Sequence, residues 1–130
     1  MSDDIREQGM TTRREVLGDA HVDGAIAGAD EFTADFQEHI TRYAWGAVWS
    51  RPGLDRRTRS CITVAMLAAQ GSEPELAMHV RAAVRNGVSV EEIKEILLQV
   101  AVYAGVPRAN RAFIVARDAL AGTDTATEST

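Results

Sequence analysis

The chain has 130 residues, a formal net charge of −5 and 45% hydrophobic residues. This length suits one domain with a hydrophobic core, and the acidic balance argues against nucleic acid as a main partner. Its apolar stretches are shorter than the roughly 18 residues of a membrane-spanning helix, so we predict no membrane partner. The acidic start lacks the apolar run of a secretory signal, and the single cysteine, Cys61, excludes an internal disulfide. Together these features predict a cytoplasmic protein.

The N-terminal part predicts two helices. Residues 5–17 predict a short helix, and His21 falls in an expected loop. Over residues 32–50 the helical spacing of apolar residues predicts one stripe, formed by Phe32, Phe36, Ile40, Tyr43 and Ala47. Trp45 and Trp49 fall on the opposite, outer face. Two aromatics there indicate a partner surface or a pocket wall, or else packing against the N-terminal segment.

The C-terminal part predicts four more helices, each bounded by glycine or proline signals. Their expected ranges are residues 56–70, 73–86 and 90–103, followed by a last helix that begins near Pro107. Ser89 and Glu92 are spaced as a capping box at the start of the third of these helices.

The expected fold class is all-α, a compact bundle of about six helices in one domain over residues 1–121. Residues 122–130 are polar and predict a disordered tail. Three of the predicted helices are apolar on two faces, which is more apolar surface than one small bundle buries. Homo-oligomerisation is the simplest way to bury the remaining surface.

Four arginines, Arg51, Arg56, Arg57 and Arg59, lie within nine residues. Three of them fall at a predicted helix start, which already carries roughly half a positive charge. Guanidinium groups and backbone N–H donors together therefore predict a site for a small anion. The alternative is a solvated charged loop paired with Asp55, a kind of pair that contributes little to stability.

His79 is the candidate chemical residue, because Glu75 precedes it by four residues on the same helix face. An imidazole with a pKa of about 6.5 suits proton transfer, and a neighbouring carboxylate would orient it. Spacing alone favours the alternative of a core histidine satisfied by a hydrogen bond.

Asp35 and His39 form a weaker pair of the same type. No cluster has the ligand count of a zinc site, so we predict no metal. Cys61 lies in an apolar run, so we predict that it is a small core residue.

The run Trp-Gly-Ala-Val-Trp-Ser-Arg-Pro-Gly-Leu over residues 45–54 is far more specific than any of these spacings. Further motifs are Arg-Thr-Arg-Ser at 57–60, Glu-Leu-x-x-His-x-Arg-Ala at 75–82 and Tyr-Ala-Gly-x-Pro at 103–107. These segments resemble the carboxymuconolactone decarboxylase family, within the alkylhydroperoxidase-D-like superfamily. The resemblance extends over roughly residues 8–120.

The resemblance implies an all-α fold that assembles as an oligomer, such as a trimer or hexamer. The superfamily often carries Cys-x-x-Cys-x-x-x-His on one helix, but here the cysteine positions match Ser72 and Glu75, before His79. Without that dithiol, peroxidase or disulfide-reductase chemistry is excluded for this chain.

The implied reaction is the cofactor-independent decarboxylation of 4-carboxymuconolactone to 3-oxoadipate enol-lactone and CO₂, a carboxy-lyase step in the protocatechuate branch of the β-ketoadipate pathway. The substrate is a dicarboxylate lactone whose own carbonyl accepts the released electrons. His79 would act as the general acid, or as a donor to the lactone oxygen, and Glu75 would orient it. The side chains that would bind the substrate, as carboxylate clamps and as an apolar wall, are Arg51, Arg57, Arg59, Trp45 and Trp49.

Two alternatives stay open. A non-catalytic helical oligomer that binds a small organic acid would explain the two-faced helices and the arginines equally well. A thiol-independent relative of the alkylhydroperoxidase superfamily would carry out a different reaction on the same fold.

Overall fold

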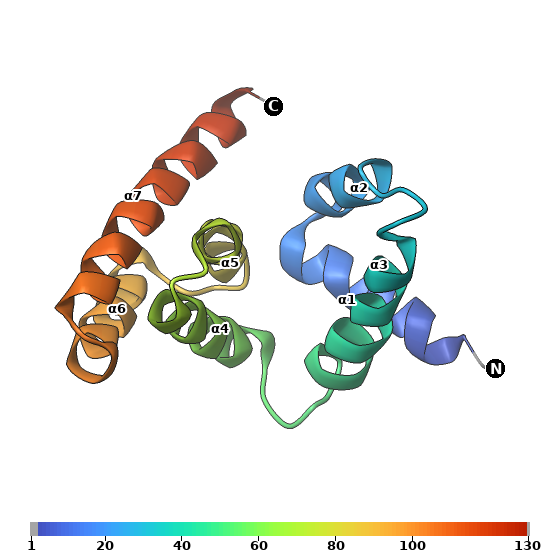
Figure 1. The fold of residues 1–130 in the computed structure, drawn as a ribbon, viewed down its shortest axis with the longest axis horizontal. Coiled ribbons are helices and arrows are strands. Elements are labelled where there is room, and N and C mark those ends of the chain that lie inside the picture. Colours follow the sequence, from blue (N-terminus) through green and yellow to red (C-terminus); the bar gives the residue numbers. More distant parts are fainter. Residues whose placement is uncertain (1–2, 130) are drawn as a thin grey trace. The chain divides into compact units, whose positions relative to one another are not determined.

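The computed structural model describes residues 3–129, with side chains through residue 122. Within this part of the chain the secondary structure is helical, with no strand, which confirms the predicted all-α class (Figure 1). The helices group into two compact units, one ending at Arg56 and the other beginning at Arg57. The single domain expected over residues 1–121 stays a prediction.

The first unit contains three α-helices and one π-helix. Their bounds are α1 (Asp4–Leu17), α2 (Asp19–Ala27), α3 (Ala34–Ile40) and η1 (Thr41–Trp49). The expected loop around His21 is wrong, because His21 lies exposed on α2. Gly18, with a φ of 93°, allows a sharp turn after α1, and a second helix begins at once. This helix is one reason why the structure has more helical segments than the six expected.

The close crossing of α1 over η1 organises this unit (Figure 1). A Cβ atom on Gly9 would lie 2.1 Å from the carbonyl oxygen of Thr41 and 2.9 Å from the backbone nitrogen of Gly46. A Cβ atom on Gly46 would lie 2.5 Å from the carbonyl oxygen of Ile5. The two backbones therefore touch at this point, where only glycine fits.

The predicted stripe over residues 32–50 is wrong about which face is buried. Trp45 is only 5% exposed, whereas Phe32, Phe36 and Tyr43 are 94%, 61% and 62% exposed. Phe32 lies in the turn before α3, so the stripe begins outside the helix. For Trp45 the cause is the π-helix that continues α3, because its i→i+5 hydrogen bonds turn each side chain through a smaller angle than an α-helix does. A period of 3.6 residues therefore assigns the wrong phase, and Trp45 turns inward.

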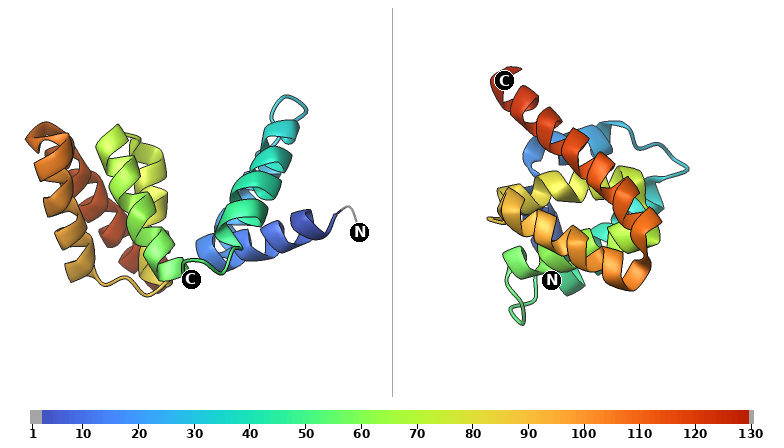
Figure 2. Two further views of the ribbon diagram at one scale, coloured as in Figure 1. Left: turned by 90° about the horizontal axis from the view of Figure 1, so that it is seen from below. Right: turned by 90° about the vertical axis from the view of Figure 1, so that its left-hand side faces the viewer.

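The second unit is a four-helix arrangement whose bounds closely confirm the predicted ranges. It contains α4 (Arg56–Gln70), α5 (Glu73–Arg85), α6 (Val90–Ala104) and α7 (Val106–Ser129). Both α5 and α6 pack against α7 (Figure 2). The helical backbone of α7 extends beyond Gly122, but the side chains from residue 123 onward lie outside the described residues. The disordered tail at residues 122–130 stays a prediction.

The core of the second unit is made from one face of each of its helices. Val64, Leu76, Val80, Ile93 and Leu97 are buried together with alanines of α7. The predicted capping box is confirmed, because Ser89 Oγ accepts from the Glu92 N–H while Glu92 Oε1 accepts from the Ser89 N–H. No helix in the described residues is long and apolar enough to cross a membrane.

The glycine crossing predicts opposite effects for two substitutions in neighbouring helices. Gly9→Ala should lower the free energy of unfolding by about 1–3 kcal/mol, because the new methyl group overlaps the backbone of η1. Gly24→Ala on α2, where nothing lies within 4 Å, should raise it by up to about 1 kcal/mol through helix propensity. Urea denaturation of both variants measures this difference. Equal stability of the Gly9→Ala variant and the wild type would show that the crossing is loose.

Candidate active site

The sequence-predicted site residues fall in both units, and the structure describes each group within its own unit. The first unit holds Trp45, Trp49 and Arg51, and the second unit holds Arg57, Arg59, Glu75 and His79.

The two tryptophans of the first group lie on the same face of η1. Their ring centroids are 5.1 Å apart at an interplanar angle of 32°. Trp45 is buried and Trp49 is half-buried. Of the two interpretations of these tryptophans, packing within the protein therefore applies to Trp45. Ser50 Oγ donates to the Trp45 carbonyl at 2.7 Å and lies 2.7 Å from Thr12 Oγ1, which ties the end of η1 to α1. A possible role of the two rings as a pocket wall stays a prediction.

Arg51 follows directly after this tied helix end. Its N–H donates to the Val48 carbonyl at 3.1 Å, and its side chain is exposed. The following Pro52 keeps the chain from continuing as a helix, as the sequence predicts. The backbone of Arg51 is therefore fixed, while its guanidinium lies at the surface of the first unit.

His79 lies on the buried face of α5, with 7% of its surface exposed. Leu76 and Val80, one on either side of it along the helix, are almost completely buried. The prediction that His79 points into the core or its edge is therefore confirmed. Burial restricts the imidazole to few orientations and shields it from bulk water, which suits either a structural histidine or a positioned acid.

Glu75, in contrast, is exposed on α5. Among the side chains of residues 3–122 its carboxylate makes no hydrogen bond or ion pair, so the orienting contact with His79 is not formed in this structure. The role of Glu75 stays a prediction. Such a role requires that the side chain change its rotamer or that it act on the substrate directly.

Two members of the arginine cluster pair with glutamates from other helices. Arg56 Nη1 lies 2.7 Å from Glu15 Oε1, and Arg57 forms an ion pair with Glu92, the residue of the capping box. The sequence also allowed a charged segment held by ion pairs instead of an anion site, and this holds for Arg56 and Arg57. Their partners are glutamates, not the expected Asp55. The ion pair with Glu92 uses Nη2 of Arg57, so a substrate carboxylate would bind to the remaining N–H donors or compete with Glu92. Sequence spacing gives no signal for partners 35 or more residues away.

Arg59 occupies a different environment on the first turns of α4. Its side chain is half-buried, whereas Arg57 is exposed. Thr63 Oγ1 donates to the Arg59 carbonyl at 2.8 Å, one turn further along the helix. A half-buried guanidinium has less conformational freedom to lose on binding, which makes Arg59 the better placed of the two predicted second clamps.

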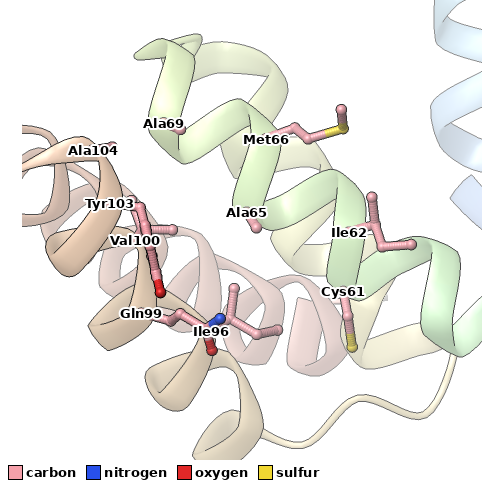
Figure 3. Close-up of a pocket in the computed structure, with 10 residues that line it drawn as sticks. All are labelled: Cys61, Ile62, Ala65, Met66, Ala69, Ile96, Gln99, Val100, Tyr103 and Ala104. Atoms are coloured by element: carbon pink, nitrogen blue, oxygen red, sulfur yellow. The ribbon is translucent and has the colours of Figure 1, made fainter.

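The second unit also has a groove of about 460 Å³ between α4 and α6 (Figure 3). Met66 and Ile62 line it from α4, and Val100 and Tyr103 line it from α6. No charged side chain lines this groove, and none of the predicted site residues does. An apolar groove without cations is unsuited to a dianion, so it is not the predicted anion site. Cys61, predicted as a core residue, is half-buried at its edge.

The described residues contain no group of three or more His, Cys, Asp or Glu side chains that would hold a metal ion. The candidate residues are thus Arg51 and two tilted tryptophans in the first unit, and two arginines and a buried histidine in the second unit. These groups can bind carboxylates, exclude water and transfer a proton.

The comparisons with known proteins agree with the helical fold and these residue types. The sequence pattern of the Carboxymuconolactone decarboxylase family matches residues 34–118. A 4-carboxymuconolactone decarboxylase from Acinetobacter baylyi is 49% identical over 119 residues, which cover 91% of this chain and 89% of that protein. A nitrosuccinic acid decarboxylase from Metarhizium robertsii is 45% identical over 109 residues, or 84% of this chain and 76% of its own length.

A shorter match agrees with these two. It is a 4-carboxymuconolactone decarboxylase from Pseudomonas putida, 52% identical over 40 residues, which cover 31% of this chain and 83% of that sequence. The fold is an all-helical one, and the chain belongs to the carboxymuconolactone decarboxylase family.

The different environments of Glu75 and His79 predict different effects on stability. Glu75→Gln should change the free energy of unfolding by less than about 0.5 kcal/mol, because its carboxylate is exposed and has no contact to lose. His79→Ala should cost about 2 kcal/mol or more, because it leaves a cavity beside Leu76 and Val80. Chemical denaturation measures both. A Glu75→Gln variant that unfolds as easily as His79→Ala would reveal a contact of Glu75 that the structure lacks.

Proposed function

We propose that the chain is a carboxy-lyase that removes CO₂ from 4-carboxymuconolactone and releases 3-oxoadipate enol-lactone, without a cofactor. The observation that carries this proposal is the 49% identity to the enzyme of that name from Acinetobacter baylyi over nearly the whole of both chains. The proposed reaction belongs to the protocatechuate branch of the β-ketoadipate pathway. We propose a cytoplasmic location, which the free thiol of Cys61 supports.

The substrate supplies the electron sink for its own decarboxylation. The bond between the γ-carbon and the leaving carboxylate breaks, and its electron pair passes through the adjacent C=C bond to the lactone carbonyl. A proton then adds to the α-carbon, which gives the enol-lactone. The protein has to bind two carboxylates, stabilise negative charge on the lactone oxygen and deliver one proton.

We assign the proton to His79, as general acid to the α-carbon or as donor to the lactone oxygen. Its burial among apolar side chains supports this role, because a shielded acid loses its proton to the substrate rather than to bulk water. Glu75, four residues earlier on α5, is the proposed residue that orients and tunes the imidazole once substrate is bound.

We assign carboxylate binding to Arg51 through a bidentate fork, with Arg59 or Arg57 as the second clamp. The half-buried side chain favours Arg59, because it has less conformational freedom to lose on binding than the exposed Arg57. Trp45 and Trp49 are the proposed apolar wall.

Nitrosuccinic acid is the second candidate substrate, because a decarboxylase of that compound is 45% identical to this chain. It is also a dicarboxylic acid, and its nitro group accepts electrons as the lactone carbonyl does. The requirements for two cationic clamps and one proton donor are therefore the same. The shape of the apolar wall would decide between a ring and an open chain.

We propose that the protein is a homo-oligomer, such as a trimer or hexamer. The groove between α4 and α6 supports this, since it exposes large apolar side chains on the second unit. Met66 is 58% exposed, Val102 is 73% exposed and Tyr103 is 85% exposed. A second copy of the chain would remove this surface from water.

The assigned roles predict distinct kinetic effects. Wild-type protein should release CO₂ from 4-carboxymuconolactone, and His79→Ala should lower kcat by about 10²–10⁴-fold, the usual contribution of a general acid. Arg51→Lys should mainly raise KM, because a planar fork becomes a point charge. Initial rates of CO₂ release measure all three.

Nitrosuccinic acid is run in parallel as the competing substrate. A kcat/KM that is higher for nitrosuccinic acid than for the lactone would change the substrate assignment and leave the reaction class intact. Turnover of neither compound would contradict the proposed function. Near-normal turnover by His79→Ala would remove the acid role from His79.

The proposed interface predicts a dissociating substitution and a matched control. Met66→Glu should shift the protein to smaller species, because it places a charge in the groove between α4 and α6. Val90→Glu, at a position 55% exposed outside that groove, should leave the assembly unchanged. Sedimentation velocity measures both. A wild-type monomer, or dissociation by the control alone, would contradict the proposed interface.

A further inference from the structure

Arg13 on α1 is an almost completely buried arginine, with 5% of its surface exposed. Nη2 donates to Gln37 Oε1 at 3.0 Å, and Nη1 donates to Thr41 Oγ1 at 3.4 Å. Both acceptors are neutral, and the second contact is long. Its Nε is buried and has no hydrogen-bond partner among the described residues.

The other arginines of α1 and η1 are bound differently. Arg6 donates from Nε to both carboxylate oxygens of Glu38, at 2.7 and 2.9 Å. Arg14, next in the sequence to Arg13, lies 3.1 Å from Asp19 and 2.9 Å from Asp23. Each of these cations has an anion, whereas Arg13 has no carboxylate within ion-pair distance among the side chains of residues 3–122.

This environment is unfavourable for a cation. Burial is the main cause that lowers the pKa of Arg13, and the nearby positive charge of Arg14 adds to it. An arginine stays protonated under such conditions, so the protein carries an uncompensated buried charge. Such a charge is unfavourable unless an anion joins it.

We propose that Arg13 is a carboxylate-binding residue, which takes one carboxylate of the dicarboxylate substrate on its unpartnered Nε edge, which is buried until the ligand enters. This inference rests on the proposed decarboxylation of a dicarboxylate. Nε and one terminal nitrogen form the planar pair of donors that matches a carboxylate. Gln37 and Thr41 hold the guanidinium by its terminal nitrogens and bring no negative charge of their own, so the edge keeps its affinity for an incoming anion.

The fold places Arg13 and Arg51 in the same unit, and Arg13 is then a further cation for the two carboxylates of the substrate, in addition to the second clamp at Arg59 or Arg57. Thr12, adjacent to Arg13, contacts Ser50, adjacent to Arg51, through their hydroxyl oxygens at 2.7 Å. Thr41 Oγ1 also donates to the Gln37 carbonyl at 2.8 Å, which leaves its lone pair directed to Arg13. The guanidinium is thus held rigidly, and little conformational entropy is lost on binding.

Arg13→Met and Arg13→Lys test this role, with Arg14→Met as the matched control. Arg13→Met should raise KM for 4-carboxymuconolactone by roughly tenfold or more, the worth of a charge-assisted bidentate bond. Arg13→Lys should lie between it and the wild type. The melting temperature of substrate-free Arg13→Met should equal or exceed that of the wild type, because a buried unpaired cation is removed. Arg14→Met should leave KM unchanged.

A second readout does not need turnover. Maleate, a simple dicarboxylate, should raise the melting temperature of the wild type and of Arg14→Met, and should have little effect on either Arg13 variant. If the wild type does not decarboxylate the lactone but maleate stabilises it through Arg13, the proposed substrate fails and the carboxylate site stands.

Three results would overturn the inference. One is an unchanged KM together with an unchanged maleate effect in Arg13→Lys, which keeps the charge and is the variant to use if Arg13→Met does not fold. Another is a large drop in the melting temperature of Arg13→Met with a normal KM, which would make Arg13 a structural cross-link. The third is dissociation of the oligomer with a normal KM, which would assign the missing carboxylate to a second copy of the chain.

Discussion

The contact of two helix backbones, α1 and η1, is the constraint on which the first unit depends. Gly9 and Gly46 let the backbones touch, and any larger side chain at either position would separate the helices. The contact buries Trp45 and encloses Arg13, and the link between Thr12 and Ser50 carries it to the end of η1. The geometry of the candidate carboxylate site is thus set by backbone packing, a rigid foundation for positioning charged side chains.

Electrostatics distinguishes the arginines that stabilise the fold from those available for chemistry. Arg6, Arg14 and Arg57 meet carboxylates of other residues and fasten segments together. Arg13 meets only neutral oxygens, although it is the most buried of them. Natural proteins retain unfavourable charges where binding requires them, and the ligand then supplies the missing anion. The same logic explains why the apolar groove between α4 and α6 suits a protein partner and not the substrate.

The sequence predicts the second unit well, because its signals are local. Glycines after helices, the capping box at Ser89 and a period of 3.6 residues fix the bounds of α4, α5 and α6 and the start of α7 to within a residue or two. The same local signals fail in the first unit, because a π-helix changes the angle between successive side chains and turns Trp45 inward. The inward direction of His79 follows from its place on an apolar stripe. The burial of Arg13 and the pairing of Arg57 with Glu92 arise from contacts between segments far apart in sequence, for which one sequence gives no signal.

A crystal structure of the assembled protein with a non-reacting dicarboxylate, such as maleate, would test whether arginines hold a dicarboxylate while His79 supplies a proton. We expect one carboxylate on Arg51, the other on the Nε edge of Arg13, and the imidazole of His79 about 3 Å from the ligand. A ligand bound away from all the arginines, or a His79 ring directed away from it in every copy, would show that these residues do not form the catalytic site.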